Sequence, residues 1–331
     1  MVDFHKKCLF IFSVAFIVGL LVHLSLFWVN LGVPMEQERY LNEWLVKKDT
    51  YAASIKEPKI IFVSGSSTLF GIDTERIEHE LTIPTVNFGV NASLFYYTLK
   101  RAQKHLQAGD IVILPLEYPY YTWHHDIFDP EPTCYYLGYD ADEIRSLSLS
   151  GKMKFISQIS TKSLLKFTCQ RILTSNHIEG GYSSKYLNIN GDMTNNHTDK
   201  KMSNSVLQSK INHSVFTEPP LTDDARHELA TFINYCHDNN IIVYAAWPSY
   251  LWKEKKFDGA DLAGVNEIEN FYRTMNVEIL GSYTDCLYDI DMFYDTNYHL
   301  NEDGKRIHTD YIIDLLRKKM ISNKSNTVRD S

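Results

Sequence analysis

One long apolar segment near the N-terminus, Cys8–Val29, constrains this chain of 331 residues more than any other feature. Only two serines, a glycine and a histidine interrupt it. A helix of this length, rising about 1.5 Å per residue, crosses a hydrocarbon core about 30 Å thick. The run exceeds the apolar core of a typical signal peptide, and no small-x-small cleavage site follows it. We therefore predict that residues 1–32 form a short cytoplasmic stub and an uncleaved transmembrane anchor.

The charges on the two sides of this segment predict its orientation. Lys6 and Lys7 precede it, whereas Glu36 and Glu38 follow it. Positive charges favour the cytoplasmic side of a membrane helix. The N-terminus is therefore expected in the cytoplasm, and the rest of the chain is expected outside it, in a bacterial periplasm or on the outer face of the cell membrane. The bilayer is thus the first predicted partner.

After a polar connector at residues 33–57, short apolar runs alternate with helical patterns. Continuous Ile, Val and Leu runs separated by helices are typical of parallel strands covered on both faces. We predict strands at 59–63, 85–88, 110–116, 241–247 and 277–280, and helices near 73–81, 93–106, 222–237, 263–275 and 302–320. This order favours an α/β protein, a three-layer α/β/α domain at 58–321 with a parallel, flavodoxin-like sheet. Residues 322–331 form a polar tail.

A long insertion at about 120–220 interrupts this alternation. It is rich in Tyr, Asn, Ser and His and has few long apolar runs, although Met153–Leu173 has a helical pattern. Long irregular insertions in compact domains commonly serve as lids, binding regions or interaction surfaces.

Composition excludes two classes of function. The formal net charge is −8, and Lys and Arg do not gather into a surface that would neutralise phosphates, so no nucleic-acid partner is expected. The five cysteines contain no Cys-x-x-Cys pair, which argues against a zinc site and a dense disulfide framework. We accordingly predict no metal site.

The first candidate for chemistry is the turn Gly65-Ser66-Ser67, directly after the first predicted strand. A sharp turn of small residues between a strand and a helix can present a serine hydroxyl beside free backbone amides, as a nucleophile needs. The same pattern also occurs in phosphate-binding turns and in ordinary strand-to-helix loops.

A second candidate lies near the C-terminus, where Asp295 and His299 precede the last predicted helix and Asn301 can cap it. A serine nucleophile needs a base within hydrogen-bonding reach and a carboxylate that orients the imidazole. In an open parallel sheet, loops that follow different strands meet at the same edge. The early serine and the late Asp and His can therefore converge.

These segments together resemble the SGNH (GDSL-like) hydrolase superfamily. The similarity lies in Gly65-Ser66-Ser67, Asn87–Asn91 and Asp295 through Gly304, which look like its blocks I, II and V. It covers roughly residues 58–120 and 240–320, not the insertion. The order and spacing are similar to a membrane-anchored, extracytoplasmic branch that includes the teichoic-acid D-alanyl transfer protein and exopolysaccharide O-acetylation proteins.

The resemblance implies roles for individual residues. Ser67 would be the nucleophile, with Ser66 in the place usually held by Asp, and attack by Ser66 itself stays open. His299 would be the general base and Asp295 its orienting carboxylate. The amides near Ser67 and Gly89 would line an oxyanion hole.

Two features depart from the family pattern. Asp295 precedes His299 by one residue more than the usual Asp-x-x-His, so Asp291 and Asp289 remain alternatives. Glu117 stands near the position where block III normally offers an Asn donor, and an ionised carboxylate cannot donate a hydrogen bond. Either Asn91 or a backbone amide then replaces that donor, or the oxyanion hole is weakened.

The resemblance implies a serine-dependent O-acyltransferase or acyl esterase that acts on an envelope or exported polysaccharide or polymer. No cofactor is expected, and a membrane-bound acyltransferase would be the partner that supplies the acyl group. The alternative is a non-catalytic scaffold or assembly protein that keeps the fold within a polymer-modification complex.

Overall fold

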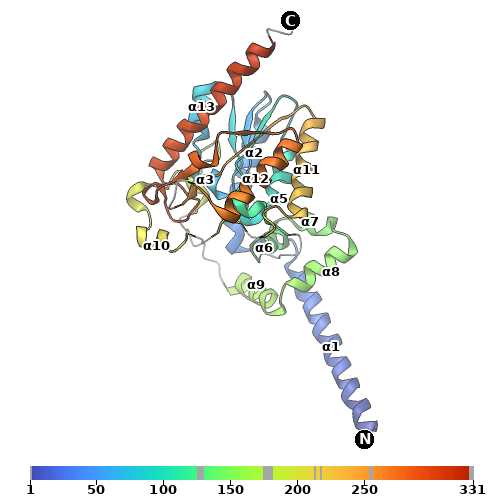
Figure 1. Ribbon diagram of the computed structural model, residues 1–331. Coiled ribbons are helices and arrows are strands. Elements are labelled where there is room, and N and C mark those ends of the chain that lie inside the picture. Colours follow the sequence, from blue (N-terminus) through green and yellow to red (C-terminus); the bar gives the residue numbers. More distant parts are fainter. Residues whose placement is uncertain are drawn as a thin grey trace. The chain divides into compact units, whose positions relative to one another are not determined.

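A computed structural model of the protein describes residues 2–124, 130–173, 182–211, 214–216, 218–252 and 256–327 (Figure 1). The chain divides into two compact units, each built from two separate segments. One unit comprises Met1–Asn42 and Phe128–Gly180, and the other comprises Glu43–Ile127 and Gly181–Ser331. The larger unit holds the sheet, and the smaller unit holds the apolar N-terminal helix.

A five-stranded sheet with all neighbours parallel forms the centre of the larger unit. Its order is β2-β1-β3-β4-β6, from β1 (Ile60–Phe62), β2 (Thr85–Asn87), β3 (Ile111–Leu114), β4 (Ile242–Ala246) and β6 (Glu278–Leu280). The prediction of an α/β fold with a parallel sheet is confirmed. The chain moves outward from β1 to β2 and then returns to the other side of β1, so the switch point of this doubly wound order lies between β1 and β3.

Helices cover both faces of this sheet (Figure 1). On one face, α4 (Thr74–Leu81) and α13 (Glu302–Thr327) pack on alternate strand residues in a cluster that contains Phe62, Ile113 and Ile312. The opposite face carries α5 (Tyr96–Gln103), α11 (Asp223–Asp238) and α12 (Gly259–Thr274). This unit also contains most of α2 (Arg39–Ser54), α3 (Ser66–Gly71), α10 (Asn204–Gln208) and the short parallel pair β5 (Tyr250–Leu251) and β7 (Leu287–Tyr288).

Side-chain caps fix three helix starts that the sequence predicted. Asp73 accepts a hydrogen bond from the Arg76 amide at 3.0 Å, and Thr222 accepts one from the Ala225 amide at 3.1 Å. Asn301 accepts one from the amide of Gly304 at 3.0 Å, which begins α13. Each such cap contributes about 1 kcal/mol and satisfies an amide that the helix itself cannot.

The smaller unit contains α1 (Val2–Asn30) and four helices of the insertion, α6 (Pro130–Tyr139), α7 (Ala141–Ser146), α8 (Leu149–Gln158) and α9 (Thr161–Leu173). The apolar helix is long enough to cross a membrane, as an anchor or as a signal sequence. Its C-terminal end is covered, since Phe27 packs with Leu137, Phe155 and Leu164. The first half of the insertion is therefore helical where it is described, rather than irregular.

A buried ion pair ties the start of β1 to the start of β3. Lys59 Nζ lies 2.7 Å from Asp110 Oδ2, and both side chains are fully buried. Asp110 also accepts the backbone amides of Lys59 at 3.0 Å and Gln107 at 2.9 Å. Breaking one side of a buried pair leaves an uncompensated charge, which is more costly than losing the pair.

We expect Asp110→Asn to lower the free energy of unfolding by about 3–5 kcal/mol, because the Lys59 ammonium loses its counter-charge. Urea unfolding of the detergent-solubilised full chain, followed by circular dichroism, measures the change. The matched double variant Lys59→Met with Asp110→Asn should recover part of the loss. Equal stability of Asp110→Asn and the natural chain would contradict this account of the pair.

Candidate active site

The turn after β1 brings Ser66 and Ser67 to the first turn of α3. Gly65 precedes them, and a Cβ atom on it would lie 2.4 Å from Glu117 Oε1 and 2.8 Å from the Ala92 Cβ. Glycine is thus required by the close approach of Glu117. The Ser64 hydroxyl donates to the carbonyl of Pro115 at 2.7 Å, which ties this turn to the end of β3.

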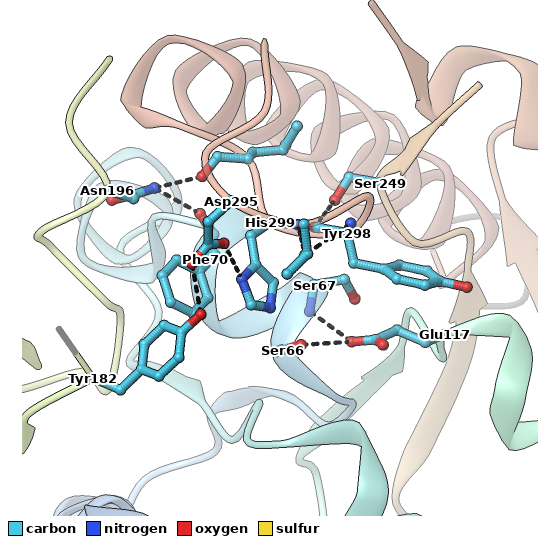
Figure 2. Close-up of polar contacts among 12 residues, drawn as sticks. Ser66, Ser67, Phe70, Glu117, Tyr182, Asn196, Ser249, Asp295, Tyr298 and His299 are labelled. Carbon is cyan, nitrogen blue, oxygen red and sulfur yellow. Dashed lines mark hydrogen bonds and ion pairs between the residues drawn. The ribbon is translucent and has the colours of Figure 1, made fainter. Parts of the chain in front are cut away.

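Glu117 follows β3 and reaches across the switch point to the serine turn (Figure 2). Its Oε1 accepts the backbone amide of Ser67 at 2.7 Å and the Ser66 hydroxyl at 3.4 Å. The side chain is buried, and this burial raises the pKa of Glu117 above its ordinary value, although the Ser67 amide favours the charged form. Glu117 was predicted near the position of the family's Asn donor, and in the structure its carboxyl is the acceptor for the backbone amide of Ser67.

Asp295 and His299 form a close pair in the loop before α13. Nδ1 of His299 lies 2.7 Å from Asp295 Oδ1, and both side chains are buried. Of the two alternative carboxylates, Asp289 is exposed, and Asp291 is exposed and accepts hydrogen bonds from Lys201 and Asn204. The longer spacing between Asp295 and His299 therefore does not prevent their contact.

Two aromatic side chains hold this pair in place. The Phe70 ring of α3 stacks on the imidazole of His299, with centroids 4.1 Å apart and planes 10° from parallel. The hydroxyl of Tyr182, from the second half of the insertion, donates to Asp295 Oδ2 at 2.5 Å, and its ring packs edge-on against both Phe70 and His299. Neither residue was predicted from the sequence.

Asn196 joins the serine helix to the histidine loop. Its amide nitrogen donates to the Phe70 carbonyl at 3.1 Å and to the Leu300 carbonyl at 2.7 Å. Because Ser67 and Phe70 are three residues apart, they lie on the same face of α3. The stacking of Phe70 on His299 therefore places Ser67 one turn from the imidazole, and Figure 2 shows His299 between Asp295 and the serine turn.

Ser67 is buried, and among the described residues its Oγ has no hydrogen-bond partner. His299 uses Nδ1 for Asp295, so its Nε2 is the nitrogen that could act as a base. The described contacts contain no hydrogen bond between Ser67 Oγ and His299 Nε2. Such contacts are often loose without substrate and tighten when it binds.

The backbone amides that were predicted to line an oxyanion hole already donate hydrogen bonds within the protein. The amide of Ser67 is bound to Glu117, and the amide of Gly89 donates to Asn87 Oδ1 at 2.9 Å. Asn91 accepts the Ser93 amide at 2.9 Å, so its oxygen caps a short 3-10 helix, Ala92–Leu94. The roles of Gly89 and Asn91 in an oxyanion hole stay predictions.

No group of three or more potential metal-ligating side chains comes together within the described ranges. Searches against protein-family models and against curated proteins found no match for this chain. The inference of function accordingly depends on the geometry of the residues described above.

The ionisation of Asp295 gives the site a pH-dependent contribution to stability. Burial opposes the charge, but hydrogen bonds from His299 and Tyr182 outweigh it, so the pKa of Asp295 lies below its ordinary value of 3.8. A carboxylate with a depressed pKa stabilises the fold above its unfolded pKa, and this contribution is lost as pH falls through the folded pKa.

We expect Asp295→Asn to lower the free energy of unfolding at pH 7 by about 1.5–3 kcal/mol, the range for hydrogen bonds to a charged group. The difference from the natural chain should shrink below about pH 3.8, where that carboxylate takes up its proton. Unfolding curves at pH values from about 2.5 to about 7, which span the titration of an Asp side chain, would measure the loss at neutral pH and its decrease in acid. A difference that stays constant over that range would contradict the assignment, and Asp314→Asn on the exposed side of α13 serves as the control.

Proposed function

We propose that this protein is a serine-dependent acyltransferase or acyl esterase of the SGNH type, acting on a polymer of the cell envelope. The observation that carries the proposal is the Asp295–His299 pair beside Ser67, whose buried hydroxyl has no partner among the described residues. The strand order further supports it, since Ser67 and Glu117 follow the two strands that flank the switch point, where open α/β sheets bind their ligands.

The chemistry follows from the orientation of the imidazole. Asp295 accepts a hydrogen bond from the N–H at His299 Nδ1, which leaves the Nε2 lone pair as the base. Nε2 takes the proton of the Ser67 hydroxyl while Oγ attacks the carbonyl carbon of an acyl ester, and the ester's alcohol leaves with that proton. An acceptor hydroxyl, or water, then attacks the acyl-serine and regenerates Ser67.

Glu117 determines how the oxyanion of that reaction is stabilised. Its carboxyl already accepts the hydrogen bond of the Ser67 backbone amide. This amide can donate to an oxyanion only when the Glu117 side chain moves away. In its protonated form Glu117 carries an O–H that can itself donate to the oxyanion, and its burial favours that form by raising the pKa. One well-placed oxyanion donor contributes about 3–4 kcal/mol to lowering the barrier.

The same contacts favour a second candidate, a non-catalytic scaffold of an envelope-modification complex. The amides of both Ser67 and Gly89 are bound to acceptors of the protein itself. A protein that keeps the fold but no longer stabilises an oxyanion would have both amides bound in this way.

The smaller unit supports retention of α1 as an anchor. Phe27 and Asn30 are buried, and Asn30 donates to the Leu164 carbonyl at 3.2 Å and to the Thr168 hydroxyl at 2.9 Å. Cleavage after α1 would remove part of this unit's core. With Lys6 and Lys7 on the cytoplasmic side, the proposed catalytic unit faces outward, where envelope polymers lie and where a membrane-bound acyltransferase could deliver the acyl group.

A fluorophosphonate probe, which phosphonylates activated serines with loss of fluoride, separates the two candidates. We expect the full chain to be labelled, and Ser67→Ala and His299→Ala to lower the labelling rate at least about 1,000-fold, because nucleophile and base act together. The neighbouring Ser66→Ala is the matched control and should retain labelling.

Loss of labelling in Ser66→Ala alone would move the nucleophile to Ser66. A folded natural chain that is never labelled favours the scaffold, whereas labelling that appears in Glu117→Ala would show that this carboxyl blocks a competent site. Acyl content of the envelope polymer with and without the chain then identifies the acceptor.

Retention of the anchor is tested by the intact mass of the protein purified from membranes. We expect the mass of the complete chain, because Phe27 and Asn30 belong to the packed core of the smaller unit. A mature N-terminus at or beyond residue 31 would contradict a retained anchor.

A further inference from the structure

The helices that surround the end of α1 begin close to where the hydrocarbon core of a membrane would end. All described side chains of Phe4–Val22 are exposed, and His23 is the first that other helices partly cover. Lys6 and Lys7 stay outside the hydrocarbon core, so the span is counted from Cys8; at 1.5 Å per residue, Cys8–Phe27 covers about 30 Å, the thickness of that core. His23 therefore lies about 6 Å inside the membrane boundary, at the depth to which interfacial helices bury their apolar faces.

The turn between α8 and α9 lies at the same level. Nδ1 of His23 lies 2.8 Å from the Thr161 hydroxyl, and Nε2 lies 3.1 Å from the Ile156 carbonyl oxygen. Further along α1, Asn30 bonds to Leu164 and Thr168, so α9 ascends beside α1 from its first turn. All these residues belong to the smaller unit, and their placement does not depend on the other one.

This helix pair exposes large apolar side chains. Leu149 is 78% exposed, Met153 on the next turn of α8 is 65% exposed, and Leu165 of α9 is 52% exposed. Trp28 of α1, five residues beyond His23, is 67% exposed, and tryptophan is enriched at the membrane interface. At the depth of His23, these exposed apolar side chains can contact the edge of the hydrocarbon core.

The charge of the same helices has one sign. Between Glu143 and Glu179 the sequence has no Asp or Glu, although the whole chain has a net charge of −8. The lysines of this stretch are Lys152 and Lys154 on α8 and Lys162 and Lys166 on α9. Apolar and basic side chains on adjacent helices are the composition of segments that lie in the interface of anionic membranes.

We propose that α8 and α9 form an interfacial membrane-binding surface, which inserts Leu149, Met153 and Leu165 among the lipids and binds anionic headgroups through its lysines. The binding of an anionic lipid surface by these helices is distinct from the span of α1. It requires neither the proposed enzymatic activity nor a particular orientation of α1.

A fluorescent probe that senses polarity tests the insertion. Single cysteines at Met153 or Leu165 are labelled with nitrobenzoxadiazole in the full chain, in which the exposed Cys8 and Cys169 are replaced by Ser. Asp142→Cys is the reference position, since α7 packs near Gly32, about 13 Å beyond His23 along α1. The chain is reconstituted in phosphatidylglycerol or phosphatidylcholine vesicles.

We expect labels at 153 and 165, but not at 142, to shift to shorter wavelengths and to be quenched by lipids with brominated acyl chains. The shift should be larger in phosphatidylglycerol. The double variant Lys162→Gln with Lys166→Gln should weaken the preference for phosphatidylglycerol over phosphatidylcholine by about fivefold per lysine. The matched double variant Lys104→Gln with Lys200→Gln in the larger unit should leave this preference unchanged.

Labels at 153 and 165 that stay as polar as the label at 142 in both vesicles would overturn the proposal. Insertion that is equal in the two lipids, or unaffected by the Lys162 and Lys166 changes, would overturn the role of the lysines. A shift of the labels at 153 and 165 that appears only after another membrane protein is added would assign this surface to a protein partner instead.

Discussion

Glu117 projects from the end of β3 across the switch point of the sheet and accepts the amide proton of Ser67. This hydrogen bond fixes the first turn of α3, which in turn places Phe70 against the imidazole of His299. The missing Cβ of Gly65 makes the approach possible, because that atom would overlap the carboxyl group. A single buried carboxyl group thus links the ends of two adjacent strands to the helix that carries the candidate nucleophile.

The second half of the insertion completes this arrangement from the other side. Tyr182 bonds to Asp295, and Asn196 bridges α3 and the histidine loop. Between them, Asp192 accepts hydrogen bonds from the Thr74 hydroxyl at 2.8 Å and the Asn87 amide at 2.8 Å, which fastens the segment to β2 and α4. The insertion is therefore part of the site's support, and the acid–base pair depends on residues more than a hundred positions away in the chain.

Sequence reasoning succeeded where the signal is local. Apolar runs predicted the strands, and Asp73, Thr222 and Asn301 marked helix starts because a cap needs only its own helix. The contact between Asp295 and His299 could be predicted because one loop holds both residues. Tyr182 gave no signal, since its partner is 113 positions away, and the bond from Ser67 to Glu117 depends on two loops whose separation only the folded sheet defines. The helices at 130–173 were missed in part because Tyr- and Ser-rich sequence weakens their apolar periodicity.

The packing of α1 has a practical consequence for any attempt to obtain this protein without its membrane segment. Phe27 fills a space between Leu137, Phe155 and Leu164, and Leu26 and Leu31 lie at the edge of the same cluster. A chain that started after α1 would lack Phe27 and would present Leu137, Phe155 and Leu164 to water, which favours self-association. A soluble form is better made by omitting both segments of the smaller unit together, Met1–Asn42 and Phe128–Gly180.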